Sequence, residues 1–394
     1  MEVIRENYLS FLEKGKDKND VIKVITGMRR SGKSTLLKQY AERLVSKGVP
    51  EDHIFMLNFE ETEYQYISDK EILNQWIVNN LPKKGQYYIF LDEIQNVNGW
   101  EMSVSGLQNR PGCDVYITGS NSSMLSSELA THISGRYIEI KIMPLSFKEY
   151  LQLYPSDDTQ KRFSDYLEFG GLPAVNPDND VMFNEGLLEG IFNTILIKDI
   201  LSRMKTDDVS KITSIVRFLY SNIGNTTNID NIAKATGINN VTISKYIGEM
   251  CKAFLFYYAE RYDIVGKKIL RSNGKYYTSD IGMRNAMLKS YTGRDISKPL
   301  ENVIYLELLR RGYDVKIGSY KDHEVDFTAT GPEGIEYFQV CQTLMAEETY
   351  NREIRPFEEI KDNYPKTILT LDRLGLGSDN GIRIVNVIDW LLNE

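Results

Sequence analysis

Residues 27–34 have the composition of a loop that binds phosphate groups. They read Gly-Met-Arg-Arg-Ser-Gly-Lys-Ser and match GxxxxGK[ST] at every fixed position. Glycines let main-chain N–H groups turn inward around an anion, and a following helix directs its free N–H groups to the same point. We expect Lys33 to reach the β- and γ-phosphates of a nucleotide and Ser34 to coordinate Mg²⁺. The expected nucleotide-binding residues are Gly27, Met28, Arg29, Arg30, Ser31, Gly32, Lys33, Ser34 and Thr35.

Two adjacent acids, Asp92 and Glu93, follow the apolar stretch Tyr-Tyr-Ile-Phe-Leu. A carboxylate at the tip of a strand can hold the water shell of Mg²⁺, and the next one can polarise an attacking water. We therefore expect Asp92 to serve the metal and Glu93 to act in hydrolysis. Acids commonly end strands, so the pair gains its meaning from the glycine-rich loop upstream.

Polar residues also end the next apolar stretch, Val-Tyr-Ile-Thr-Gly-Ser-Asn. Ser120 and Asn121 are candidates to lie beside the γ-phosphate and the attacking water, with Thr118 behind them. The alternative is an ordinary loop of small polar residues.

Arginines provide further candidates. Arg136 is expected either to stabilise the departing γ-phosphoryl group, in cis or on a neighbouring subunit, or to form a structural ion pair. Action in trans requires assembly, so the oligomeric state stays open. Arg29 and Arg30 lie between the loop glycines, where side chains contact phosphate or a partner, or point to solvent. No guanine-reading motif of the Asn/Thr-Lys-x-Asp type occurs in the expected region, which favours ATP over GTP.

The elements around these residues indicate an α/β fold. Apolar stretches at 21–26, 53–59, 87–92, 114–119 and 137–142 are separated by helix-length segments. This pattern is typical of a parallel sheet covered on both faces, and it predicts a first domain at about 1–150. A mostly helical region is expected at 151–208. Residues 209–294 have the order helix, short helix, glycine turn, helix and hairpin of a winged helix-turn-helix, and 295–394 read as a small α/β domain.

The chain resembles a family of prokaryotic AAA-like ATPases with a C-terminal domain of unknown function. The motifs that carry the resemblance are Ile25 to Thr35, Phe90-Leu-Asp-Glu-Ile-Gln, Thr118-Gly-Ser-Asn, Ser134-Gly-Arg-Tyr, Pro144-Leu-Ser-Phe-Lys-Glu-Tyr, Gly170-Gly-Leu-Pro, Leu300-Glu-Asn and Glu324-Val-Asp-Phe. The resemblance implies a P-loop NTPase core, a winged-helix region and a tail similar to restriction endonucleases. It also implies the roles given above to Lys33, Ser34, Asp92, Glu93 and Arg136.

A working nuclease of that type needs a helix glutamate, an aspartate and then an acid-x-lysine. Glu301 and Asp326 fit the first two positions, but the third reads Gln339-Val-Cys341 and lacks both the acid and the lysine. Two carboxylates bind a metal poorly, so we expect a retained fold without cleavage.

Seven basic residues against three acidic ones lie between Lys245 and Lys275. This local basic segment is the footprint expected of DNA contact; the alternative is a module that contacts protein, with solvated lysines.

The composition of the whole chain narrows the functions that the protein can have. The chain has 394 residues, 42% hydrophobic, with a formal net charge of −8, so any contact with nucleic acid needs a local basic patch. Three separated cysteines and three histidines disfavour a zinc site, and no stretch has the apolar length of a membrane span. We expect a cytoplasmic, Mg²⁺-dependent ATPase that repositions its C-terminal domains, with DNA as a candidate partner. The alternatives are a nucleotide-dependent switch or scaffold for a protein partner, and an enzyme with a working nuclease tail.

Overall fold

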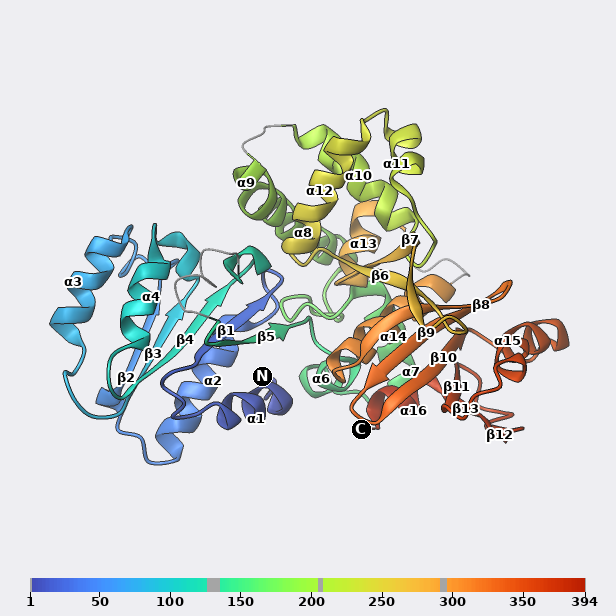
Figure 1. Cartoon of the computed structure of the whole chain (residues 1–394), viewed down its shortest axis with the longest axis horizontal. Helices are drawn as coiled ribbons and strands as arrows, with labels where there is room; N and C mark the ends of the chain where they lie inside the picture. The colour runs from blue at the N-terminus through green and yellow to red at the C-terminus, as the bar shows by residue number, and fades with distance from the viewer. Residues whose placement is uncertain (1, 126–134, 205–207, 291–295, 394) are drawn as a thin grey trace. The chain divides into compact units, whose positions relative to one another are not determined.

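The computed structural model describes residues 2–125, 135–204, 208–290 and 296–393 (Figure 1). The chain forms two compact units, one of residues 1–143 with 252–254, the other of residues 144–251 with 255–394. The first unit thus ends at Met143, several residues before the expected boundary near 150, because Pro144 and Leu145 pack with the residues that follow them. Leu145, for example, donates its N–H to Gly171 O over 2.7 Å.

The first unit is a five-stranded parallel sheet with strand order β2-β3-β4-β1-β5. Its strands are β1 (Ile22–Gly27), β2 (Ile54–Asn58), β3 (Tyr87–Asp92), β4 (Cys113–Gly119) and β5 (Tyr137–Ile142). The sequence pattern predicted all five within one or two residues. Because β4 is inserted between β1 and β3, the carboxyl ends of these three strands adjoin along one edge of the sheet.

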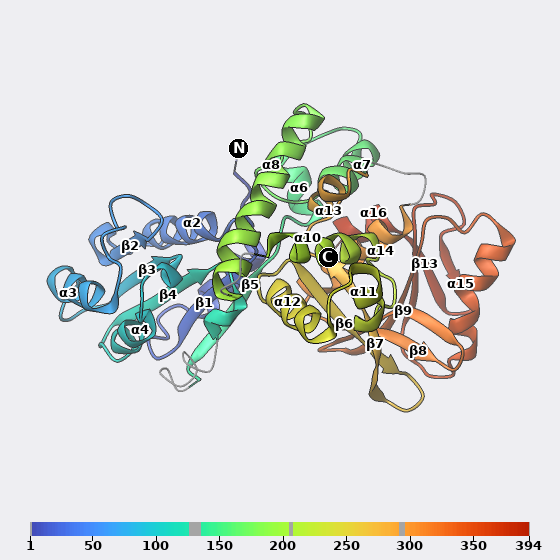
Figure 2. The same ribbon diagram turned by 90° about the horizontal axis from the view of Figure 1, so that it is seen from above.

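Helices cover both faces of this sheet, as Figures 1 and 2 show. One face packs against α1 (Glu6–Lys14) and α2 (Lys33–Ser46), the other against α3 (Lys70–Asn80) and α4 (Trp100–Gln108). Alternate residues of β3 supply the two cores, with Tyr88 and Phe90 on the α2 side and Ile89 on the other. This is why the strands read as continuous apolar runs rather than as alternating ones. The sequence pattern did not predict α1 or α4.

The second unit begins with helices. They are α6 (Phe147–Leu153), α7 (Thr159–Phe169), α8 (Val181–Thr194), the π-helix η4 (Ile195–Leu201), α9 (Ser202–Met204), α10 (Val209–Ser221), α11 (Ile229–Thr236) and α12 (Asn240–Lys252). The expected helical region and the three expected helices from residue 209 onward are all present. In Figure 2, α10, α11 and α12 form one group beside the hairpin that follows them.

An eight-stranded sheet completes the second unit, with order β12-β13-β11-β10-β9-β8-β6-β7. Its strands are β6 (Phe256–Asp263), β7 (Lys268–Thr278), β8 (Asp314–Tyr320), β9 (His323–Gly331), β10 (Gly334–Cys341), β11 (Lys366–Thr370), β12 (Gly377–Asp379) and β13 (Ile382–Asn386). Its helices are α13 (Ile281–Leu288), α14 (Ser297–Arg310), α15 (Glu347–Glu359) and α16 (Val387–Leu392).

Strand pairing crosses the expected boundary between residues 294 and 295, because β6 pairs in parallel with β8, Arg261 opposite Ile317. The hairpin expected to form a separate wing is therefore part of the same sheet as the C-terminal strands. Pairing partners more than fifty residues apart cannot be read from local pattern, which is why the sequence did not predict this shared sheet.

The Gly170-Gly-Leu-Pro motif has a structural role in this unit. Asp280 caps the N-terminus of α13, and its buried carboxylate accepts the N–H of Gly171 over 2.8 Å. A Cβ atom on Gly170 would lie 2.3 Å from Asp280 Oδ1, so the close approach requires glycine. Burial raises the pKa of Asp280 to about 6.

Candidate functional site

The glycine-rich loop connects β1 directly to α2. Gly27 ends β1 at φ 150°, and a Cβ atom there would lie 2.1 Å from Ile142 O, which only glycine avoids. Gly32 takes φ 98° and caps the N-terminus of α2, which begins at Lys33. The loop therefore presents the free N–H groups of α2 at the carboxyl edge of the sheet, an arrangement that attracts anions.

Lys33 lies inside this loop with 4% of its surface exposed. Its Nζ donates to Gly27 O over 3.2 Å and to Met28 O over 3.3 Å. The same ammonium lies 3.5 Å from Glu93 Oε1. The lysine thus bridges the loop and the end of β3, where it can meet a phosphate held by the loop.

Asp92 and Glu93, at the end of β3, are joined through Thr118 of β4. The Thr118 hydroxyl donates to Asp92 Oδ1 over 2.5 Å and accepts the N–H of Glu93 over 2.8 Å. Ser34 also hydrogen-bonds the Asp92 carboxylate, and burial raises the pKa of Asp92 despite these bonds. A serine hydroxyl beside a buried carboxylate is the donor set that Mg²⁺ takes alongside nucleotide phosphates, so these residues fit that ion.

Glu93 has a left-handed backbone with φ 54°. Such strain in a residue other than glycine clusters at functional sites. The side chain of Gln95, two residues further on in the 3₁₀ helix η2 (Ile94–Asn96), donates to Glu93 Oε2. Gln95 was not among the expected site residues. Its place two residues after the paired acids, within the quoted Leu-Asp-Glu-Ile-Gln motif, was the only available signal.

Ser120 and Asn121 both lie at this edge and are buried, with 1% and 0% exposed. Ser120 Oγ accepts from Arg29 Nη2 over 3.4 Å, which connects the end of β4 to the loop after β1. The structure thus gathers these expected residues near Lys33, Asp92 and Glu93. Arg30 takes φ 67° and is exposed, whereas its neighbour Arg29 is 9% exposed.

Arg136 lies at the opposite edge of the sheet. It precedes β5, and its carbonyl accepts the N–H of Ile22, the first residue of β1, whereas Gly27 at the far end of β1 pairs with Ile142. Six residues of parallel strand therefore separate Arg136 from the loop, roughly 20 Å at the usual rise. This placement corrects the expectation of a contact in cis; the role in trans stays a prediction. Ser134 of the quoted motif lies outside the described residues.

Arg5, which the sequence pattern did not single out, also contacts the loop. Arg5 is 4% exposed, and its Nη1 donates to Ser31 O over 3.1 Å. Its guanidinium also lies 4.6 Å from the ring centre of Tyr8 on α1. The segment before α1 thus supports the loop from the side of the helix layer, a long-range contact that no local pattern could reveal.

The second unit contains a buried charged cluster around Glu301 of α14. Lys275 Nζ, on β7, lies 3.0 Å from Glu301 Oε1 and 2.8 Å from Glu324 Oε1, and the hydroxyl of Tyr277 donates to Glu301 over 2.6 Å. Burial lowers the pKa of Lys275, but the surrounding carboxylates, led by Glu301, more than offset this and raise it. Lys275 therefore pairs with Glu301, one of the two acids that the sequence pattern assigned to a degenerate metal site.

Asp326 and Gln339 adjoin this cluster on β9 and β10. Asp326 accepts the N–H of Val340 over 2.8 Å, and its own N–H donates to Gln339 Oε1 over 3.2 Å. Burial, together with the charge of Glu301, raises the pKa of Asp326 to about 7. Within the described part of the chain, no group of three or more His, Cys, Asp and Glu residues is arranged to hold a metal ion.

The burial of Lys275 also corrects the expected basic face at 245–275. With 2% of its surface exposed, Lys275 cannot contact a partner. Lys245 on α12 is exposed, as are Lys267 and Lys268 at the β6–β7 turn, while the side chain of Arg271 is not among those described. The exposed basic surface is thus smaller than the count of seven suggested.

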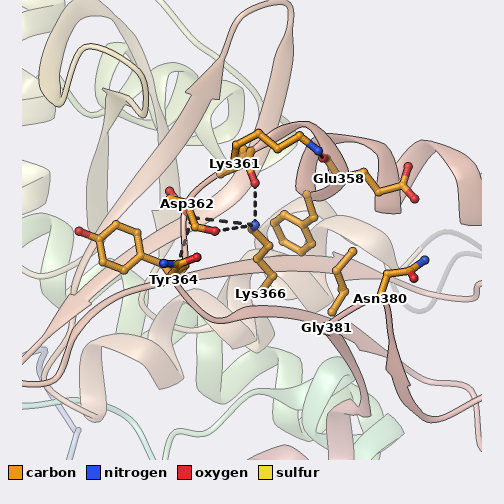
Figure 3. Close-up of a pocket in the computed structure, with 11 residues that line it drawn as sticks. Glu358, Lys361, Asp362, Tyr364, Lys366, Asn380 and Gly381 are labelled. Atoms are coloured by element: carbon orange, nitrogen blue, oxygen red, sulfur yellow. Dashed lines mark hydrogen bonds and ion pairs between the residues drawn. The ribbon is translucent and has the colours of Figure 1, made fainter.

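A surface cavity of about 600 Å³ lies in the second unit beside α15 and β11 (Figure 3). Lys366 Nζ projects toward it but donates to Ile360 O over 2.7 Å, and Lys361 Nζ donates to Glu358 O over 2.8 Å. Both ammonium groups thus donate to main-chain carbonyls. The residues that line the cavity do not include Lys275, Glu301 or Glu324 of the charged cluster. Across the described residues, no helix is both long and apolar enough to cross a membrane.

Two protein-family models match the chain. Residues 19–151 match an AAA domain, and residues 160–293 match a domain of unknown function (DUF8612). A Haemophilus influenzae protein described as uncharacterised is 40% identical, with 99% of this chain and 98% of that protein covered. A similarly described Methanocaldococcus jannaschii protein is 32% identical, with 93% and 85% covered.

Solved structures are more distant. A STAND (signal transduction ATPase with numerous domains) protein from Pyrococcus horikoshii with a tetratricopeptide repeat sensor aligns at 14% identity and a TM-score of 0.32. That alignment covers 79% of this chain but only 46% of the Pyrococcus chain. PCH-2 of C. elegans aligns at 14% identity and a TM-score of 0.29, over 62% of this chain and 70% of that one.

Proposed function

The chain belongs to the family of AAA-domain proteins that includes these Haemophilus and Methanocaldococcus relatives, and from that premise we propose that it binds and hydrolyses ATP with Mg²⁺. The observation that carries the proposal is the meeting of Lys33, Asp92 and Glu93 at one edge of the sheet, beside the N-terminus of α2. A phosphate-binding helix end, a buried carboxylate and a second carboxylate for water are the parts that hydrolysis of a phosphoanhydride needs.

Each residue has a distinct role in this mechanism. The loop N–H groups and Lys33 hold the β- and γ-phosphates, while Ser34 and Asp92 are the ligands for Mg²⁺, which neutralises developing charge when bound. Glu93 orients a water and takes up its proton. Gln95 donates to the Glu93 carboxylate and so restricts its orientation. Thr118 keeps the two acids in fixed relation.

Three variants of the whole chain test this activity. Lys33→Ala should lose nucleotide binding, whereas Lys38→Ala, an exposed lysine on the same helix, should retain it. Glu93→Gln should bind ATP normally and stop hydrolysis, because the amide cannot accept the proton of the water. Phosphate release and fluorescent-nucleotide binding measure the two steps. Failure of the wild type to bind ATP at millimolar Mg²⁺ would refute the proposal, and unchanged turnover in Glu93→Gln would remove Glu93 from its role.

We further propose that hydrolysis moves the C-terminal unit, and that this unit contacts DNA in a cytoplasmic protein. The order of α10, α11, α12 and the β6–β7 hairpin supports a winged helix. So does the segment between α10 and α11, which pairs with β7: Thr226 forms an antiparallel bridge with Lys275, and Thr227 N–H donates to Gly274 O over 3.0 Å. A winged helix has such a third strand beside its hairpin.

A salt titration of duplex binding tests the DNA contact. Because phosphate contacts release counterions, Lys267→Ala combined with Lys268→Ala should weaken binding and flatten its salt dependence. Lys321→Ala serves as control, since its side chain is 61% exposed in the same unit. No binding at low salt eliminates the DNA contact. DNA-independent ATP hydrolysis would instead favour the alternative, a nucleotide-dependent switch or scaffold for a protein partner.

We propose that the C-terminal sheet does not cleave DNA, although Glu301 and Asp326 fit two of the acid positions of a restriction-endonuclease site. The pairing of Lys275 with Glu301 and Glu324 supports this, because an internal ammonium ion already balances the carboxylates. Plasmid incubated with Mg²⁺ or Mn²⁺ should stay intact, and nicking that disappears in Asp326→Asn would overturn the conclusion.

A further inference from the structure

Arg29, the third residue of the loop, points inward although it lies between the two loop glycines. Its Nη1 lies 3.0 Å from Glu60 Oε1, and its Nη2 donates to Ser120 Oγ over 3.4 Å. Only 9% of Arg29 is exposed, whereas the adjacent Arg30 is exposed. Two identical side chains in one loop thus have opposite environments.

The contacts of Arg29 place its guanidinium at the catalytic edge of the sheet. Ser120 follows β4, and β4 lies between the strands that carry the loop and the paired acids. A phosphate chain cradled by the loop has its terminal phosphate on this side, because the Lys33 ammonium and the Glu93 carboxylate meet there. A cation at this position faces the charge that grows during phosphoryl transfer.

The partner that holds Arg29 can release it. Glu60 lies in the turn after β2, and 43% of its side chain is exposed, so water can solvate the carboxylate when the guanidinium leaves. While the pair is formed, the Glu60 carboxylate balances the positive charge of the largely buried guanidinium. A terminal phosphate has two negative charges and offers more acceptors to the arginine fork than a carboxylate does.

We propose that Arg29 is an arginine finger acting in cis, whose guanidinium exchanges Glu60 for the γ-phosphate of bound ATP. This inference rests on the proposed ATP hydrolysis and adds the group that senses the third phosphate. It also supplies within one chain the cation that Arg136, at the other edge of the sheet, cannot supply in cis. A second subunit is then not required to complete the site.

The test compares Arg29→Ala and Arg29→Lys in the full chain. Equilibrium binding of ADP and of a non-hydrolysable ATP analogue gives the preference for the third phosphate, and steady-state hydrolysis gives kcat. Arg29→Ala should lose most of that preference and reduce kcat by about 100-fold or more, since arginine fingers contribute ~10³–10⁵. Arg29→Lys should retain part of the preference for the third phosphate and part of kcat.

Two controls keep the outcomes separate. Arg43→Ala removes a surface arginine that pairs with Glu6 on α1, and it should change neither quantity. Glu60→Ala removes the competing carboxylate and should strengthen binding of the ATP analogue more than binding of ADP, a readout that survives if Arg29→Ala fails to fold. Wild-type preference and kcat in Arg29→Ala, or no change in Glu60→Ala, would overturn the inference. A wild type that binds ATP without hydrolysing it would refute the proposed hydrolysis and leave the binding preference as the test of Arg29.

Discussion

The hydroxyl of Thr118 donates a hydrogen bond to Asp92 Oδ1 over 2.5 Å. The hydroxyl oxygen of Thr118 in turn accepts the N–H of Glu93, so one small side chain from β4 contacts both acids at the end of β3. The contact exists because β4 is the neighbour of β3 in the sheet. The two acids are therefore oriented by a residue that is twenty-six positions from Asp92 and twenty-five from Glu93 in the sequence.

Replacing Thr118 with valine removes the hydroxyl at nearly constant volume. Without it, Asp92 loses one hydrogen bond and the Glu93 backbone loses its acceptor. We therefore expect Mg²⁺ affinity or the turnover rate to fall ~10- to 100-fold, as for other groups that orient metal ligands. Hydrolysis measured against Mg²⁺ concentration checks this. Thr118→Ser retains the hydroxyl and should recover most of the activity; a valine variant with the wild-type Mg²⁺ profile would contradict the role.

Gln95 should affect turnover without affecting ATP affinity. Its amide donates to Glu93 Oε2, so Gln95→Ala leaves the carboxylate less well oriented, and we expect kcat to fall ~10-fold or more while the Kd for ATP stays the same. Gln95→Glu should lower kcat further because two carboxylates then face each other. Asn96→Ala, an exposed neighbour in the same turn, is the matched control. Equal kcat in both alanine variants would argue against the assignment.

The burial of Lys275 predicts a large loss of stability when its charge is removed. Lys275→Met leaves Glu301 and Glu324 without their main counter-ion, and breaking a buried pair costs about 3–5 kcal/mol. Lys298→Ala removes a second partner of Glu301, but this lysine is 38% exposed, so the loss should be smaller. Chemical denaturation measures both. The double variant Lys275→Met with Glu301→Gln should be less destabilised than the two single losses added together.

Asp326 makes the stability of the second unit depend on pH. Its pKa is raised to about 7 by burial and by Glu301, against about 3.9 for an unfolded aspartate. Folding therefore favours the protonated carboxyl, and the contribution of this group to stability decreases as pH rises from about 4 to about 7 and is constant above that. Asp326→Asn stays neutral, so its melting temperature relative to wild type should increase over the same interval. A difference that is the same at pH 5 and pH 8 would contradict this.

The sequence alone determined the glycine-rich loop and the five strands of the first sheet. Both depend on short-range physics: Gly27 and Gly32 are required by backbone angles and close approaches, and apolar runs form strands buried on both faces. The paired acids at the end of β3 were identifiable for the same reason, since the residues that follow a buried strand must lie at its tip.

Only the tertiary structure decided which distant residues meet. Strand order brought Thr118 to Asp92, and no local pattern contains strand order. Likewise Lys275 was counted with a basic surface, although pairing of β7 within the eight-stranded sheet buries it against Glu301. Charge in a sequence shows what a side chain can pair with, but the fold determines whether its partner is solvent, phosphate or a buried acid.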